Sequence, residues 1–195
     1  MITRALPDLQ AWTAHCLAAP TPVLADTVEL LEGYRANEDA VDAHLLAETI
    51  SADPLMSLKL MAHVATVRSS RSTTDPETVT AALVMLGISP FFRAFGPQTT
   101  VDQHLSGHPE ALQGFHRVLR RAHRSASFAL AFAVHRMDHD APVIHAAALL
   151  HDFAELLLWL HAPVLALQIA QRQRRDPTLR SVEVQRELLH IELQD

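Results

Sequence analysis

The sequence predicts an all-α protein, and three observations indicate this fold class. Hydrophobic residues make up 49% of the chain but aromatic residues only 5%, because Ala and Leu, both strong helix formers, supply most of the apolar content. No stretch alternates apolar and polar residues with the period of two that a half-buried strand requires. Helix-start signals recur instead, with Asp, Ser or Thr placed directly before Pro.

These signals predict a series of helices in chain order. Thr21-Pro22 begins the first, which Gly33 ends, and Asp39 caps the second. Asp53-Pro54 begins the third, and the segment Thr74 to Glu77 begins the fourth. The expected helices span residues 23–33, 40–50, 55–67, 77–86, 90–95, 109–137, 143–161 and 164–174, with a last helix that follows Asp176-Pro177 and runs to the C-terminus.

A polar, turn-rich segment divides the chain. Residues 97–108 contain Pro, Gly, Ser and several polar side chains, which is typical of a loop. We therefore expect one domain of two helical lobes, an N-terminal lobe over residues 1–97 and a C-terminal lobe over residues 108–195.

Composition excludes several classes of protein. The net charge of -6 argues against a duplex DNA binder, which needs a basic face. Cys16 is the only cysteine, so there is neither an internal disulfide nor a cysteine-cluster zinc site. The N-terminus has no signal-peptide pattern, and ionisable residues interrupt the apolar stretch 146–167. We expect a cytoplasmic protein without a membrane partner.

The adjacent pair His151-Asp152 is the most informative feature, because two metal-binding side chains lie within an apolar helix. If residues 143–161 form one helix, the two side chains project about 100° apart. A third ligand from another helix could complete an ion site, and His123 on the preceding helix is the best candidate. The more common explanation is a buried polar pair that hydrogen-bonds across helices.

Several segments together resemble one family. AETISADPLMSLKLMAHV is similar to its segment around Asp-Pro, VTAALVMLGI to its following helix, His123-Arg124-Ser125 to its His-Ser helix, and AALLHDFAELLL to its Leu-Leu-His-Asp helix. The order and spacing resemble the HD-related output domain, or HDOD, family of the HD superfamily. The resemblance implies an HD-like helical bundle with His123, His151 and Asp152 at the superfamily's metal-ligand positions.

Departures from the HD enzymes imply a degenerate metal site. Glu155 stands where many active HD enzymes have a Lys, and Glu would repel a phosphate rather than hold it. The downstream Asp that serves as fourth ligand has no convincing match, since Asp176 lies in a polar loop and Asp195 is terminal. We therefore expect no cofactor and no catalysis, with a divalent metal at His123, His151 and Asp152 as the alternative.

Two other groups of residues are candidates for binding. His135 and His139 have a spacing that can hold zinc, but a solvated helix end with a turn at Asp138 and Asp140 is the more common explanation. Four arginines on the long helix share one face and form an anion-binding candidate, whose alternative is a surface stripe. These residues are Arg117, Arg120, Arg121 and Arg124. The basic segment 172–175 with Arg180 is interpreted as a solvated loop.

The resemblance implies a bacterial signal-transduction module that regulates by binding protein partners or a small ligand, with a link to cyclic-dinucleotide or two-component signalling. The alternatives are a metal-dependent phosphohydrolase acting on a nucleotide or cyclic dinucleotide, and a nucleic-acid-binding module that uses the arginine face. The C-terminal segment VQRELLHIELQD resembles the start of a further family helix at Glu187 and His190. We therefore expect a shortened member whose C-terminal lobe is covered by a partner or by another copy of the chain.

Overall fold

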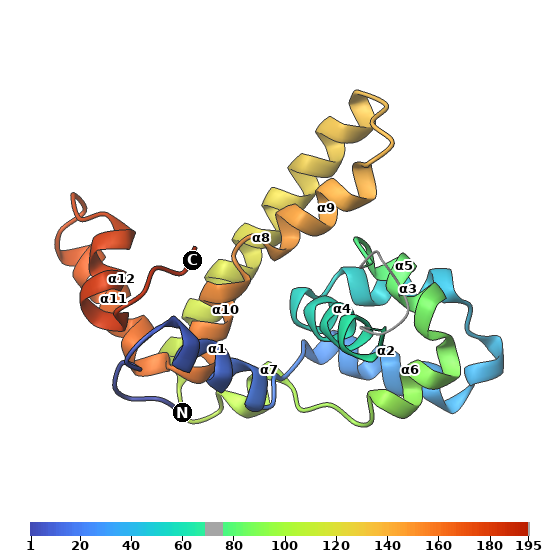
Figure 1. Cartoon of the computed structure of the whole chain (residues 1–195), viewed down its shortest axis with the longest axis horizontal. Helices are drawn as coiled ribbons and strands as arrows, with labels where there is room; N and C mark the ends of the chain where they lie inside the picture. The colour runs from blue at the N-terminus through green and yellow to red at the C-terminus, as the bar shows by residue number, and fades with distance from the viewer. Residues whose placement is uncertain (69–75, 195) are drawn as a thin grey trace. The chain divides into compact units, whose positions relative to one another are not determined.

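The computed structural model describes residues 1–68 and 76–194, and it confirms the all-α fold class. Within these residues there is no strand (Figure 1). One isolated parallel bridge joins Val23 and Thr100. The helices are α1 Leu9–Ala18, α2 Ala25–Ala36, the 3-10 turn η1 Glu38–Ala40, α3 Ala43–Ser51, α4 Pro54–Arg68, α5 Val79–Leu86, α6 Ile88–Ala94, α7 Val101–His104, α8 Pro109–His135, α9 Ala141–Leu150, α10 Phe153–His161, α11 Pro163–Arg175 and α12 Ser181–Leu189.

The chain forms two compact units whose boundaries differ from the expected lobes. Unit 1 comprises Met1–Thr21, Asp102–Arg120 and Asp152–Asp195, and unit 2 comprises Pro22–Val101 and Arg121–His151. These units differ from the expected division at 97–108 because the long helix α8 contributes to both units, and because the first residues pack with the C-terminal helices. A loop in the sequence therefore does not mark the structural boundary.

Unit 2 has a hydrophobic core built from α2 to α6. Its apolar side chains recur on the inner faces of these helices, and burying them drives the packing. Arg35 ties α2 to α6, since its guanidinium donates to the carbonyl oxygens of Phe92 and Phe95 at 2.9 and 2.7 Å. The fully buried members of this core include Leu46, Ile50, Met56, Leu60, Leu83 and Phe91.

Side-chain caps begin several helices of unit 2, although not always at the expected residue. Asp42, rather than Asp39, caps α3 by accepting from His44 N and Leu45 N. Thr78 caps α5 by accepting from Ala81 N, while Thr74 and Asp75 lie outside the described residues. Because each capping oxygen satisfies otherwise unpaired N–H groups, these residues set where the helices start.

Other helix and loop boundaries also differ from those expected. Gly33 does not end α2, which continues to Ala36. The segment 97–108 is more than a loop, because it contains α7 and pairs with Val23 through two hydrogen bonds. Val23 N donates to Thr99 O at 3.0 Å, and Val101 N donates to Val23 O at 2.9 Å.

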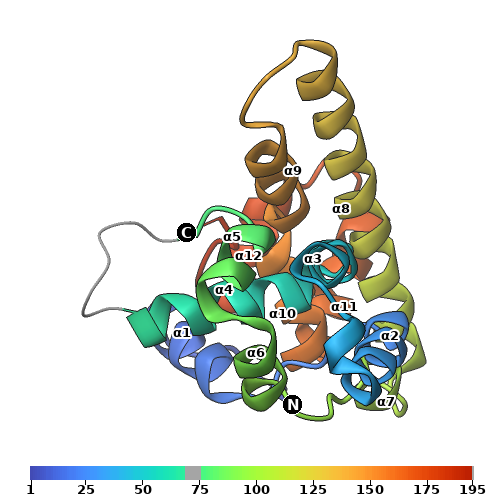
Figure 2. The ribbon, with the colours of Figure 1, turned by 90° about the vertical axis from the view of Figure 1, so that its right-hand side faces the viewer.

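The C-terminal half of α8 and α9 form a helical hairpin in unit 2. Both views show α9 running back beside α8 (Figures 1 and 2). Small side chains, Ala122 and Ala126 on α8 and Ala148 on α9, pack together with Leu149. Small residues let the two backbones approach closely, which explains why this part of the sequence is rich in Ala.

Unit 1 contains α1, which the sequence analysis did not predict. Asp8 caps this helix by accepting from Ala11 N at 2.9 Å, a signal that was present in the sequence. Trp12 on α1 is buried and donates from its indole Nε1 to the carbonyl oxygen of Leu189 at 3.0 Å. The first helix is thereby bound to the end of α12.

The last helix ends earlier than expected. α12 stops at Leu189, and His190 adopts a left-handed conformation with φ 63, a role that Gly usually performs. Leu189 is fully buried, and Ile191 and Leu193 are half-buried. These apolar side chains are therefore largely packed within unit 1 rather than fully exposed.

A glycine in α8 permits close contact between two helices of unit 1. A Cβ at Gly114 would lie only 2.4 Å from the ring of Trp159 on α10. No real side chain tolerates that distance, so Gly114 is required for the indole to lie against the α8 backbone.

The expected continuous helix over residues 143–161 is wrong. α9 ends at Leu150 and α10 begins at Phe153, with a turn at His151 and Asp152. By length and composition alone, the described stretch Ala141–His161 is apolar enough to cross a membrane, with a hydropathy of 1.5. This is weak support for a membrane span, because the core helices of other proteins pass the same test.

Candidate functional site

The site in unit 2 is organised around Asp53, the residue that begins α4. Its carboxylate is fully buried and accepts from Leu55 N at 2.8 Å and Met56 N at 3.1 Å. The other oxygen accepts from Leu24 N at 2.8 Å, at the start of α2. Burial raises the pKa of this carboxyl, although these hydrogen bonds oppose the shift. The expected helix start at Asp53-Pro54 is confirmed, and Asp53 also joins two helices.

His123 on α8 binds the residue immediately before Asp53. Its Nε2 lies 2.8 Å from the carbonyl oxygen of Ala52, the C-cap of α3. A carbonyl oxygen only accepts, so the Nε2 atom carries the proton and donates. This hydrogen bond holds α8 to the turn between α3 and α4. The protonated Nε2 cannot ligate a metal, so of the two ring nitrogens only Nδ1 is left for that role.

His145 on α9 is a site residue that the sequence analysis missed. Burial, and secondarily the nearby His123, lower the pKa of His145, so its imidazole is neutral at pH 7. The sequence did contain a signal, since His145 and Leu149 are four residues apart and share one face of α9.

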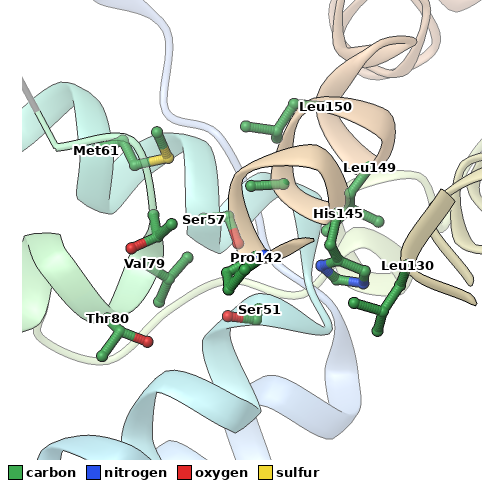
Figure 3. Close-up of a pocket in the computed structure, with 12 residues that line it drawn as sticks. Ser51, Ser57, Met61, Val79, Thr80, Leu130, Pro142, His145, Leu149 and Leu150 are labelled. Carbon is green, nitrogen blue, oxygen red and sulfur yellow. The ribbon is translucent and has the colours of Figure 1, made fainter. Parts of the chain in front are cut away.

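His145 lines a pocket of about 230 Å³ (Figure 3). Ser57 and Met61 come from α4, Leu130 from α8, and Pro142 and Leu149 from α9. Most of the lining is apolar, with four hydroxyl groups and one imidazole but no charged side chain among the described residues that line it. The lining residues are Ser51, Ser57, Met61, Thr78, Val79, Thr80, Leu130, Pro142, His145, Ala146, Leu149 and Leu150.

His151 and Asp152 are not the buried helical pair that the sequence analysis expected. His151 is exposed and Asp152 is half-buried, because the turn between α9 and α10 carries both residues to the surface. Within the part of the chain that the structure describes, no three His, Cys, Asp or Glu side chains are grouped to hold one ion. His123, His151 and Asp152 therefore do not assemble a ligand set in this structure.

The four candidate arginines on α8 are all exposed, as expected for a surface face. Arg117 lines a second pocket of about 340 Å³, which lies within unit 1. There it is joined by Arg174 of α11, but also by Glu110, whose charge opposes anion binding. The remaining arginines, Arg120, Arg121 and Arg124, do not line this pocket.

The acidic residues beside His135 and His139 form a turn, the interpretation that the sequence favoured over a zinc site. Asp138 Oδ1 accepts from Asp140 N at 3.0 Å, which confirms the interpretation of this segment as a turn. His135 and His139 are both exposed at this end of α8.

A separate cluster of imidazoles lies in unit 1. His161 is 4% exposed, and its ring is edge-on to those of His15 and His104, with centroids 5.6 and 6.3 Å away. The Nε2 of His161 has no hydrogen-bond partner among the described residues. Burial, followed by His15, His104 and the N-terminal amine, lowers the pKa of His161 to about 4.

These features define an HD-like helical protein in which the motif histidine supports the fold. The HDOD domain model matches residues 21–195, and the chain belongs to the HDOD family. This assignment confirms the resemblance that the Asp-Pro, His-Arg-Ser and Leu-Leu-His-Asp segments indicated. A search of curated proteins finds no significant match.

A solved structure shares the fold. The chain is similar to the MmoQ response regulator from Methylococcus capsulatus str. Bath, with a TM-score of 0.65 and 17% sequence identity. The match covers 91% of this chain and 70% of that one. At this low identity, the similarity establishes the fold alone.

Proposed function

We propose that this protein is a non-catalytic signal-transduction module that acts by binding. One observation carries the proposal. The Nε2 of His123, at a position that the resemblance to HD enzymes assigns to metal binding, donates to Ala52 O, and among the described residues no three His, Cys, Asp or Glu side chains are grouped around an ion site. The turn at His151-Asp152 and the acidic Glu155 give further support, since neither creates a cationic site for a phosphate. Similarity to a response regulator is consistent with a regulatory role.

A turnover assay tests the absence of catalysis. Purified protein, with added Mn²⁺ or Mg²⁺, is incubated with a cyclic dinucleotide and with a generic phosphodiester. We expect no hydrolysis above that of the Asp152→Ala variant. Clear turnover that disappears in Asp152→Ala would instead establish the metal-dependent phosphohydrolase.

We assign ligand binding to the pocket beside His145. The apolar side chains would bury a small molecule, while the hydroxyls and the neutral imidazole would orient it. Because no charged side chain lines the pocket among the described residues, a neutral ligand suits it better than a phosphate ester does. The ligand class proposed here is therefore a small, mostly apolar, uncharged molecule.

Indole is a suitable probe, since it is neutral and apolar and has a single N–H. We expect indole to shift the NMR signals of the Met61 and Leu149 methyl groups. Ala146→Trp, which fills the pocket, should abolish the shifts, whereas Ala147→Trp on the exposed face of α9 should preserve them. Equal shifts in both variants would place the binding elsewhere.

A further inference from the structure

The outer face of α8 carries two exposed aromatic side chains within unit 2. Phe128 is 66% exposed and Phe132, one turn later, is 69% exposed. The opposite face of the same helix is buried through Ala122, Ala126 and Ala133. Exposing two neighbouring Phe side chains to water is unfavourable, so this face is suited to an interface.

The residues around these aromatics repeat with the spacing of a helix-packing seam. Arg121, Phe128 and His135 are seven residues apart, and Arg124 and Ala131 occupy the intermediate positions. All five are exposed. We define these residues as the α8 seam. A large Phe beside a small Ala is the alternation that lets two helices interdigitate.

The charges at the two ends of the seam are opposite. Arg121 and Arg124 lie before the aromatics, whereas Asp138 and Asp140 follow the helix in the exposed turn. An antiparallel arrangement of two identical helices places the basic end of each against the acidic end of the other. If residue 128 of one copy lies opposite residue 131 of the other, then residue 121 of the first copy lies opposite residue 138 of the second.

We propose that a second copy of this chain packs antiparallel on the α8 seam. Phe128 covers the partner subunit's Ala131, and Arg121 faces the partner subunit's Asp138. Arg124 lies opposite the partner subunit's His135, which is the one position where two basic groups approach. The contact is isologous, so a single patch supplies both sides of a closed dimer. It does not depend on the proposed ligand or on the absence of catalysis.

The opposite charges at the two ends of the α8 seam favour a second copy of the chain as its partner over an anionic membrane or nucleic acid. A membrane or nucleic acid would attract Arg121 and Arg124 but repel Asp138 and Asp140. A copy of the same chain satisfies both signs together. The proposal therefore commits to a dimer, and binding to anionic vesicles without dimerisation would overturn it.

The mass in solution provides the first test. Light scattering of the full chain over a range of concentrations should show a monomer–dimer equilibrium. Phe128→Glu, alone or with Phe132→Glu, should weaken dimerisation by at least about tenfold, since a carboxylate would be buried at the contact. Val84→Glu on α5, at an equally exposed apolar position of 71%, is the matched control and should leave the equilibrium unchanged. A strict monomer at every concentration would overturn the proposal.

Disulfide trapping tests the register and direction. In a Cys16→Ser background, Arg124→Cys and His135→Cys variants are oxidised separately and after mixing. The antiparallel contact predicts a disulfide only in the mixture, because residue 124 meets residue 135 of the other copy. Efficient cross-linking of each variant with itself would indicate parallel packing, and no cross-linking in the mixture would exclude the proposed register.

Discussion

The imidazole of His123 donates a 2.8 Å hydrogen bond to the carbonyl oxygen of Ala52, the residue before the buried cap Asp53. Two segments distant in sequence are thus joined at one turn, where α3 ends and α4 begins. The resemblance to HD enzymes assigns the same histidine to a metal-ligand position. In this structure its Nε2 contacts the backbone, so the histidine has a structural role that does not require a metal.

Removing the His123 imidazole should destabilise the protein. In His123→Ala the carbonyl of Ala52 loses its donor, and we expect the free energy of unfolding to fall by about 1–2 kcal/mol. Urea denaturation measures this change. His139→Ala, at an exposed histidine beyond the same helix, is the control and should leave stability within about 0.5 kcal/mol. Equal effects of the two substitutions would contradict the structural role.

Two substitutions of Asp53 measure how much its carboxylate oxygens contribute to stability. Asp53→Ala removes the acceptors for Leu24 N, Leu55 N and Met56 N, and should cost about 2–4 kcal/mol. Asp53→Asn keeps one acceptor oxygen, which can still cap α4, and should cost less. Thermal and urea unfolding compare the variants. A larger loss of unfolding free energy in Asp53→Asn than in Asp53→Ala would contradict this account.

Stability should decline in acid because of His161. Burial, with the neighbouring His15 and His104, lowers the pKa of His161 to about 4 in the folded protein, from the ordinary 6.5 that applies when the chain unfolds. The unfolded chain therefore binds a proton first, and stability falls as pH drops from 6.5 toward 4, by up to about 3 kcal/mol. His161→Leu removes this group and should flatten the pH dependence in that window. If the unfolding free energy of His161→Leu changes with pH as steeply as that of the unaltered protein, His161 is not the group responsible.

Close contact between Gly114 and Trp159 predicts a strong steric effect. Gly114→Ala places a methyl group where the indole ring lies, 2.4 Å away, and should destabilise the fold despite the higher helix propensity of Ala. Trp159→Leu in the same chain should recover part of the loss. A double-mutant cycle by urea denaturation measures this coupling, and additive effects would show that the two residues do not clash.

Local signals predicted much of the fold. The helix start at Asp53-Pro54 was correct, and both ends of α11 were correct to within one residue, because capping and proline geometry act over a few residues. α9 and α10 were expected as one helix, since the apolar pattern continues through His151 and Asp152 and no Gly or Pro marks the turn. The units were misplaced because α8 is shared between them, which depends on tertiary packing.

The candidate site was predictable only in part. The sequence placed His123 correctly on the long helix, but it could not show that Ala52 O would be the acceptor. That contact joins residues that are 71 positions apart. His145 was missed because one histidine among apolar residues gives little signal until the surrounding helices form the pocket. Exposure of His151 likewise follows from the turn rather than from local composition.

NMR of the His123 side chain tests the central claim most directly. Nitrogen-15 correlation spectra distinguish a protonated from an unprotonated Nε2. We predict a protonated, hydrogen-bonded Nε2 that keeps its chemical shift when Zn²⁺ or Mn²⁺ is added. A metal-induced change in the signal of either ring nitrogen, Nδ1 included, with this effect abolished in Asp152→Ala, would contradict the account and support a metal-dependent enzyme.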